Sequence, residues 1–162
     1  MAKIILLCGK VCSGKSTYAN KIKTKYNAVI LSCDELMLTL FDEQLGDSHN
    51  VILQKVQNYL YQLGEQIVTA DTNVILDFGF WTHLERNKTK LYYADKGIKT
   101  ELHYIKISPA KWLCNIDKRN KNLENGLEKG YYIDDNMKQL FSDQFQEPDC
   151  REIDILIDTI TK

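Results

Sequence analysis

A nine-residue segment near the N-terminus constrains this chain more than any other feature of its sequence. It reads Gly9, Lys10, Val11, Cys12, Ser13, Gly14, Lys15, Ser16, Thr17. An apolar run, residues 4–8, precedes the segment directly and an amphipathic stretch follows it. Two glycines with this spacing, followed by lysine and a hydroxyl residue in a strand-to-helix context, form a phosphate-binding pattern. At ordinary glycine usage the pattern arises by chance in about one of a few hundred such chains. The segment therefore predicts a P-loop.

The residue types within this segment indicate how it would hold a nucleotide. Gly9 and Gly14 permit backbone conformations and a close approach that a Cβ would block. Successive N–H groups and the N-terminus of the following helix would then point at a β-phosphate. We expect Lys15 to reach between the β- and γ-phosphates and Ser16 to place its hydroxyl on Mg²⁺. Thr17 is expected to support the loop or the α-phosphate, so all nine residues are predicted to bind nucleotide.

Apolar runs alternate with longer amphipathic stretches along the rest of the chain. Strands are expected at residues 3–8, 28–32, 73–77, 99–107 and 153–157. This alternation is typical of βαβ units, so the sequence predicts an α/β fold with a mainly parallel sheet. The runs 29–31 and 74–76 are rich in β-branched residues and indicate strands that are buried on both faces.

Helices are expected between these strands. Their predicted ranges are 14 or 15 to about 26, 33–41, 49–72, 82 to about 97, and 109 onward. Thr82 and Glu85 have the spacing of a capping box. Ser108 followed by Pro109 has the pattern of an N-cap with proline at the first helical position.

The segment 119–132 is polar, contains two glycines and breaks the periodic pattern. It is either a lid over the nucleotide or a plain surface connection. Its place in the fold favours the lid.

Length and composition limit the classes of protein. A chain of 162 residues, 44% hydrophobic and 27% charged, is expected to form one domain over residues 1–162. The net charge of −1 gives no overall basic field that would attract nucleic acid or a membrane surface. Five cysteines without paired spacing indicate reduced thiols, and no apolar stretch is long enough to span a membrane, so we expect a cytoplasmic protein. Cys12 would be sensitive to oxidation if it is exposed.

Two carboxylates follow predicted strands at the edge where open α/β sheets bind ligands. Asp34 comes after the strand at 28–32 and would accept the proton of an attacking hydroxyl. Its alternative role is to stabilise the N-terminus of the next helix, and the two roles are compatible. Asp77 ends the strand at 73–77 and has the position of a carboxylate that holds Mg²⁺ directly or through water. Its alternative is a turn residue.

Cationic side chains are the next candidates. Arg86 lies one turn into a helix at the same edge and would touch substrate or phosphate, unless it is an exposed helix residue. Arg119, at the start of the predicted lid, would act as an arginine finger in cis, with Lys118 and Lys121 as weaker alternatives. Trp81 is either a packing residue or part of the acceptor site. Residues 120–123 lack the aspartate of a guanine-reading motif, which disfavours a GTPase.

Taken together, these residues resemble the small P-loop kinases that include chloramphenicol phosphotransferase, the zeta toxins, gluconate kinase and polynucleotide 5′-kinases. The resemblance covers nearly the whole chain. It implies a three-layer α/β/α fold with a five-stranded parallel sheet of order 2-3-1-4-5, the use of ATP with Mg²⁺, and a small arginine-bearing lid. Asp34, within residues 32–36, is similar to the general base of these enzymes, and Asp77 to their third-strand acid.

The chain differs from the sequence patterns of such kinases in two places. Residues 77–81 differ from the Asp-Gly-Phe/Tyr-Pro-Arg signature of nucleoside monophosphate kinases, and the lid carries Arg119 followed by lysines. The first departure disfavours a nucleoside monophosphate as the acceptor. From the resemblance as a whole we expect phosphoryl transfer from ATP to a hydroxyl of a small molecule, by a monomer or homodimer. The alternatives are a polynucleotide 5′-hydroxyl kinase and a nucleotide-dependent switch that binds a protein partner.

Overall fold

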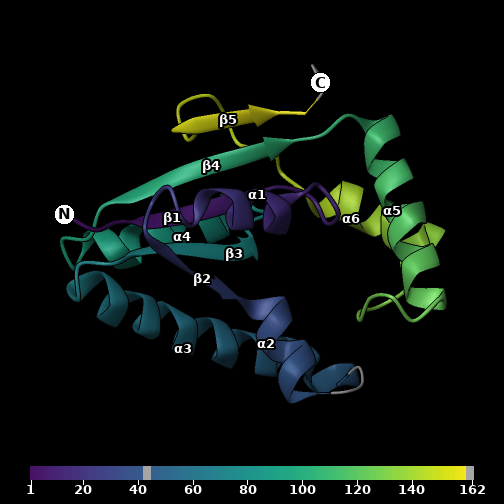
Figure 1. Cartoon of the computed structure of the whole chain (residues 1–162), viewed down its shortest axis with the longest axis horizontal. Coiled ribbons are helices and arrows are strands. Elements are labelled where there is room, and N and C mark those ends of the chain that lie inside the picture. The colour runs from purple at the N-terminus through teal and green to yellow at the C-terminus, as the bar shows by residue number, and fades with distance from the viewer. Residues whose placement is uncertain (42–44, 160–162) are drawn as a thin grey trace.

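Strands and helices alternate along the chain, as the apolar runs predicted (Figure 1). The computed structural model describes residues 1–41 and 45–159. The strands are β1 (Ile4–Cys8), β2 (Ala28–Ser32), β3 (Asn73–Gly79), β4 (Thr100–Lys106) and β5 (Ile155–Asp158). The helices are α1 (Lys15–Ile22), α2 (Cys33–Leu40), the 3-10 helix η1 (Gly46–Ser48), α3 (His49–Thr69), α4 (His83–Ala94), α5 (Pro109–Glu124) and α6 (Asp135–Gln144).

The five strands form one parallel sheet in the order β2-β3-β1-β4-β5. This confirms the predicted P-loop fold and its strand order. In the register, Ser32 lies opposite Asp77 and Cys8 lies opposite Gly79. The carboxyl ends of β1, β2 and β3 therefore meet at one edge of the sheet, beside α2, α5 and α6 in Figure 1.

The central strand β1 is buried on both faces, and none of its residues is exposed. Because side chains alternate along a strand, Ile4 and Leu6 join the core made with α2, α3 and α4. Ile5 and Leu7 join the core on the opposite face, made with α1. A third apolar cluster, centred on Trp112, Ile116 and Ile133, joins α5 to the segment that leads into α6.

The prediction of a two-sided burial is right for β3 and wrong for β2. Val74, Ile75 and Leu76 of β3 are fully buried. In contrast, Val29 of β2 is 41% exposed. The reason is that β2 is an edge strand, with β3 as its neighbour on one side only.

The predicted helix starts agree with the structure. Thr82 and Glu85 form a complete capping box at the start of α4. Ser108 caps α5 through the backbone N–H of Lys111, and Pro109 is the first helical residue.

The predicted lid differs from the structure in extent. Helix α5 continues to Glu124, so the first part of the segment 119–132 is helical. Helix α6 then follows and was not predicted, although Met137, Leu140 and Phe141 have helical spacing. The polar composition between these residues masked the signal.

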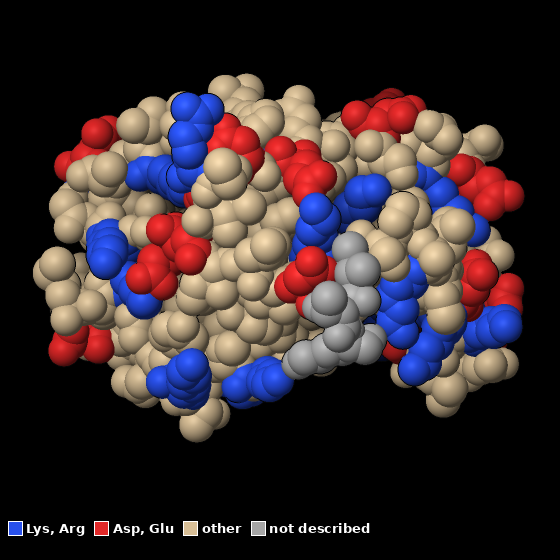
Figure 2. All heavy atoms as spheres, turned by 90° about the horizontal axis from the view of Figure 1, so that it is seen from above, with Lys and Arg blue, Asp and Glu red and all other residues tan. Residues whose placement is uncertain are grey.

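Charges of both signs are mixed on the face of the molecule that Figure 2 shows. On the face in Figure 2, Lys and Arg side chains lie among Asp and Glu side chains. This agrees with the net charge of −1. Within residues 1–41 and 45–159, no helix combines the length and the apolar character needed to cross a membrane.

Leucine truncations on the neighbouring strands β4 and β5 test the position of the core. Leu102 is fully buried and Leu156 is 52% exposed. We expect Leu102→Ala to lower the free energy of unfolding by about 2–5 kcal/mol, because it leaves a cavity between sheet and helices. Leu156→Ala should cost less than about 1 kcal/mol, since solvent replaces the lost side chain. Urea unfolding measures both values, and equal losses would contradict the described core.

Candidate active site

The predicted phosphate-binding segment lies at the junction of β1 and α1 and has the backbone of a tight loop. Cys12 and Gly14 have φ angles of 58° and 97°, in the left-handed region. A Cβ at Gly9 would lie 2.6 Å from Ser13 Oγ and 3.0 Å from the carbonyl oxygen of Ile105. Gly9 is therefore required by close packing, and Gly14 by its backbone conformation.

Helix α5 holds this loop from one side. The Trp112 indole Nε1–H donates to the carbonyl of Val11 at 2.7 Å, and the Asn115 amide donates to the carbonyl of Cys12 at 2.9 Å. The Lys10 ammonium lies 4.6 Å from the centre of the Trp112 ring. The side chain of Lys10 is thus engaged with α5, and only its backbone is available to the loop. Sequence reasoning missed Trp112 and Asn115, although they share a helix face with Arg119.

Lys15 lies at the centre of the loop. Its ammonium donates to the carbonyls of Gly9 at 3.0 Å and Lys10 at 2.8 Å. Burial lowers the pKa of this ammonium, and the carboxylates of Asp77 and Asp34 oppose that shift. Lys15 is therefore a cation held close to the floor of the site by two carbonyl groups.

Ser16 and Asp77 meet, as predicted for a magnesium site. The Ser16 hydroxyl donates to Asp77 Oδ2 at 2.7 Å. Side chains two residues apart on a strand lie on the same face of the sheet, so Asp77 shares the face of Ile75, which packs against α1. This position explains the contact between Asp77 and Ser16 of α1. The register between β1 and β3 shifts by one residue next to this point, between Leu6 and Cys8. Such irregularities occur next to active sites and redirect side chains.

The donor set of this pair fits Mg²⁺ bound to a nucleotide. A hydroxyl and a carboxylate oxygen are hard ligands, and Mg²⁺ takes its other oxygen ligands from phosphates and water. Within the described residues, no group of three or more His, Cys, Asp and Glu side chains could hold a metal ion by itself. A metal ion at this pair would therefore need ligands from the nucleotide and from water. The loop also fits an anion: a Cβ at Gly14 would meet no described atom within 4 Å beyond the adjoining backbone and the neighbouring residues, and the buried Ser13 hydroxyl has no described hydrogen-bond partner.

Asp34 faces the same space from α2. It lies in the first turn of that helix, whose N-cap is Ser32, so its carboxylate also faces the positive end of the helix dipole. The side chain is exposed to solvent within the cleft, yet the surrounding walls limit its hydration and raise its pKa. The positive charge of Lys15 opposes this shift, whereas the negative charge of Asp77 adds to it.

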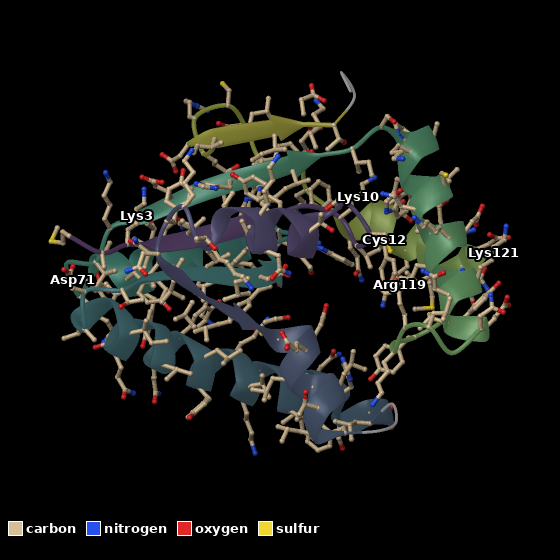
Figure 3. The ribbon with its side chains drawn as sticks, viewed as in Figure 1. Lys3, Lys10, Cys12, Asp71, Arg119 and Lys121 are labelled. Atoms are coloured by element: carbon tan, nitrogen blue, oxygen red, sulfur yellow. The ribbon has the colours of Figure 1, made fainter. Side chains whose placement is uncertain are left out.

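Arg119 approaches the loop from α5. Its Nη1 lies 3.7 Å from the sulfur of Cys12, and Figure 3 shows the side chain pointing from α5 towards the loop. A Cβ at Gly130 would lie 2.7 Å from Nη2, so the segment after α5 closes on the guanidinium. Lys121 points to the outer side of α5 in Figure 3. Lys118 lines the cleft and is the second cation of this helix at the site.

These side chains line one cleft of about 1110 Å³. From the predicted sites it includes Val11, Cys12, Gly14, Lys15, Ser16, Thr17, Asp34, Asp77 and Arg119. Gly9, Lys10 and Ser13, which were also predicted to bind nucleotide, are not among its lining residues. A second hollow of about 900 Å³, between α1 and α2, shares Ser16, Asp34, Asp77 and Arg119 with it. The fold therefore brings the predicted loop, base, metal-binding pair and lid cation together.

Sequence reasoning missed the wall that α3 contributes. This wall consists of His49, Asn50, Leu53 and Gln57. Their spacing of three to four residues places them on one helix face near the start of α3. That spacing was the available signal, but nothing in the sequence showed that this end of α3 borders the cleft.

The prediction that Arg86 binds substrate is wrong. Its side chain is completely buried, and its guanidinium is fully engaged within the protein. It contacts the carbonyls of Phe80 and Gln146, the ring of His83 and the carboxylate of Glu152. Five N–H groups meet five contacts, so none remains for a phosphate. Arg86 instead fixes the turn that follows Asp77 to the C-terminal part of the chain.

Comparisons with known proteins bear on the family and the fold of the chain. The family model AAA_33, described as an AAA domain, matches residues 4–142. No curated protein sequence matches the chain significantly.

Among solved structures, a putative kinase from Chloroflexus aurantiacus has a TM-score of 0.71 and 14% identity, over 98% of this chain and 85% of that chain. The Mycobacterium tuberculosis APS kinase CysC, in complex with AMPPNP and APS, has a TM-score of 0.66 and 16% identity, over 98% and 89%. A chain of the Pnkp1/Rnl/Hen1 RNA repair complex has a TM-score of 0.69 and 20% identity, over 88% of this chain but 43% of its own length. At these identities the similarity shows a shared fold.

Removal of the Arg86 guanidinium tests its structural role. We expect Arg86→Met to lower the free energy of unfolding by about 3 kcal/mol, because Glu152 and two carbonyls lose their buried partner. Arg151→Met is the matched control, since the Arg151 side chain is 88% exposed and, among the residues that the structure describes, forms an ion pair with Asp149 alone. Urea unfolding of both variants gives the values. Equal stability of the two variants would contradict this role.

Proposed function

Because the chain belongs to the AAA_33 family of AAA domains and has the fold of small P-loop kinases, we propose that it is an ATP-dependent kinase that phosphorylates a hydroxyl group of a small molecule. The observation that carries the proposal is the position of Asp34. Its carboxylate shares one cleft with the P-loop and with the Ser16–Asp77 pair. A carboxylate beside a phosphate-binding loop is the arrangement that proton removal from an attacking hydroxyl requires.

The loop would bind the phosphates of ATP through its backbone. The first N–H groups of α1 have no acceptor within the helix and are available to an anion. Lys15 would exchange the carbonyls of Gly9 and Lys10 for phosphate oxygens, which are stronger acceptors because they are charged. Ser16 and Asp77 would hold Mg²⁺, which neutralises charge on the phosphates when it is bound.

Asp34 and Arg119 would act on opposite sides of the transferring group. Asp34 would orient the acceptor hydroxyl and accept its proton as the bond to phosphorus forms. Arg119 would place its guanidinium on the phosphoryl oxygens from the lid side, where it stabilises the negative charge of the transition state. Catalysis then depends on positioning and electrostatics, and no covalent enzyme intermediate is needed.

A small acceptor agrees better with the molecule than a polynucleotide or a protein partner. The chain carries both charges in near balance, 21 basic against 22 acidic residues, which gives a nucleic acid little overall attraction. The cleft has walls from α2, α3 and α4 opposite the loop, and these enclose a space of small-molecule size. In this proposal the protein acts in the cytoplasm, as a monomer or homodimer.

Substitutions of Lys15 and Asp34 separate nucleotide binding from transfer. A screen of hydroxyl compounds with Mg-AMPPNP, read by thermal shift, identifies an acceptor, because a ligand that binds only the native state raises the midpoint. Lys15→Ala should abolish the shift caused by the nucleotide. Asp34→Asn should keep that shift and reduce phosphoryl transfer about 10²–10⁴-fold, the usual contribution of a general base.

Exposed residues of the same type provide the controls. Lys21→Ala and Asp95→Asn lie outside the cleft and should leave binding and transfer unchanged. Transfer by Asp34→Asn at the wild-type rate would show that Asp34 is not the base. Nucleotide hydrolysis that no hydroxyl compound stimulates would favour the switch.

The pH dependence of transfer provides a second test of Asp34. The base must be ionised, so the rate should fall as the pH drops through the pKa of this carboxyl. Limited hydration raises that pKa above the ordinary value of 3.8, and the acidic limb should lie correspondingly higher. A pH profile of kcat measures the limb. A limb at the ordinary value, or one that persists in Asp34→Asn, would contradict the assignment.

A further inference from the structure

The charged side chains of the cleft are sorted between its two halves. The half beside the phosphates is made by the P-loop and α5. It carries all the Lys and Arg side chains among the described lining residues of this cleft, namely Lys15, Lys118 and Arg119, together with one carboxylate, Glu128, which accepts from the Asn122 amide of α5. This half therefore attracts the phosphates of a nucleotide.

The opposite half, where an acceptor would lie, has the reverse charge. The described lining residues from α2, α3 and α4 include the carboxylates Asp34 and Glu85, and they include no Lys or Arg. His49 is the one titratable nitrogen that these elements add. The described parts of these helices therefore supply none of the fixed cations that recognise a carboxylate or phosphate. The second hollow beside Asp34 is lined by the cations Lys23, Arg119 and Lys129 and is not part of this half.

The remaining wall of this half is partly apolar and partly neutral. Leu53, Phe78 and Trp81 contribute apolar surface, and Asn50 and Gln57 contribute amides. The Trp81 ring packs edge-on against Phe141, with 5.1 Å between ring centres. A rigid aromatic surface next to neutral amides fits an uncharged or amine-bearing molecule with an apolar portion.

Glu85 is held in place at this half of the cleft. Its backbone N–H donates to Thr82 Oγ1 at 3.1 Å, and its carboxylate Oε2 accepts from the backbone N–H of Thr82 at 3.0 Å. The capping box thus fixes a negative charge one turn away from Trp81. A fixed carboxylate disfavours an anionic ligand more effectively than a mobile surface charge, because it cannot move away.

We propose that the acceptor is a neutral or cationic alcohol, and that Glu85 excludes alcohols that carry a carboxylate or phosphate. This inference rests on the proposed kinase function and names its substrate class. Phosphorylated sugars, hydroxy acids and polynucleotide ends are then poor acceptors, since each brings a negative charge close to Asp34 and Glu85.

Quenching of tryptophan fluorescence tests the charge of this half without knowledge of the acceptor. The chain has two tryptophans: Trp81 is partly exposed in the cleft, and Trp112 is 5% exposed. At constant ionic strength, caesium should quench Trp81 about two-fold or more better than iodide, after each is normalised to a free indole compound, because cations concentrate near carboxylates. Trp81→Phe should remove most of the quenchable signal.

A matched pair of variants assigns the effect to the cleft. Glu85→Gln keeps the capping box, since glutamine also serves there, and should bring the caesium to iodide ratio towards one. Glu124→Gln changes an exposed residue outside the cleft lining and should leave the ratio unchanged. Iodide quenching equal to or stronger than caesium quenching in the wild type would overturn the inference.

Transfer to matched acceptors separates this inference from the kinase function itself. Glucose, glucosamine and gluconate share a carbon skeleton and are neutral, cationic and anionic, so they extend the acceptor screen. A best acceptor with a carboxylate or phosphate would overturn the inference and leave the kinase function intact. Absence of transfer to any acceptor would count against the kinase function, while the quenching ratio would still decide the charge of this half.

Discussion

The register of β1 and β2 against β3 is the constraint on which the whole site depends. Cys8 pairs with Gly79 and Ser32 pairs with Asp77, so three parallel strands end at the same level. The P-loop, the proposed metal-binding carboxylate and the proposed base all lie at or directly after these strand ends. A slip of one residue would turn Asp77 away from α1 and break its 2.7 Å contact with Ser16.

Buried polar contacts then hold the segments that the sheet alone does not fix. Arg86 ties the turn after β3 to Gln146 and Glu152, near the C-terminus. Trp112 and Asn115 tie the P-loop to α5 through its carbonyls. Arg119 lies on that same helix, so one element supports the loop and also carries the proposed lid cation. A movement of α5 would therefore change nucleotide binding and catalysis together.

The two sides of the cleft differ in charge. Its three described lysine and arginine side chains belong to the phosphate side, and carboxylates fixed by helix starts and caps belong to the other side. A nucleotide and a neutral or cationic acceptor would each meet the charge that favours it. The walls of the cleft limit the hydration of Asp34 and raise its pKa against the opposing charges of Lys15 and Arg119, and a raised pKa suits the proposed role of proton acceptor.

The sequence by itself determined the α/β fold, the P-loop, the carboxylates Asp34 and Asp77, and the helix caps, because each is encoded by neighbouring residues with a fixed local geometry. Only the tertiary structure decided what long-range packing controls. Val29 is exposed because it lies on an edge strand. Arg86 is buried against Glu152 and does not line the cleft. The start of α3 lies on the proposed acceptor side of the cleft. An arginine one turn into a helix has the same local pattern whether it faces solvent, substrate or a buried carboxylate. Its role is set by partners about 60 residues away in sequence, which local patterns do not record.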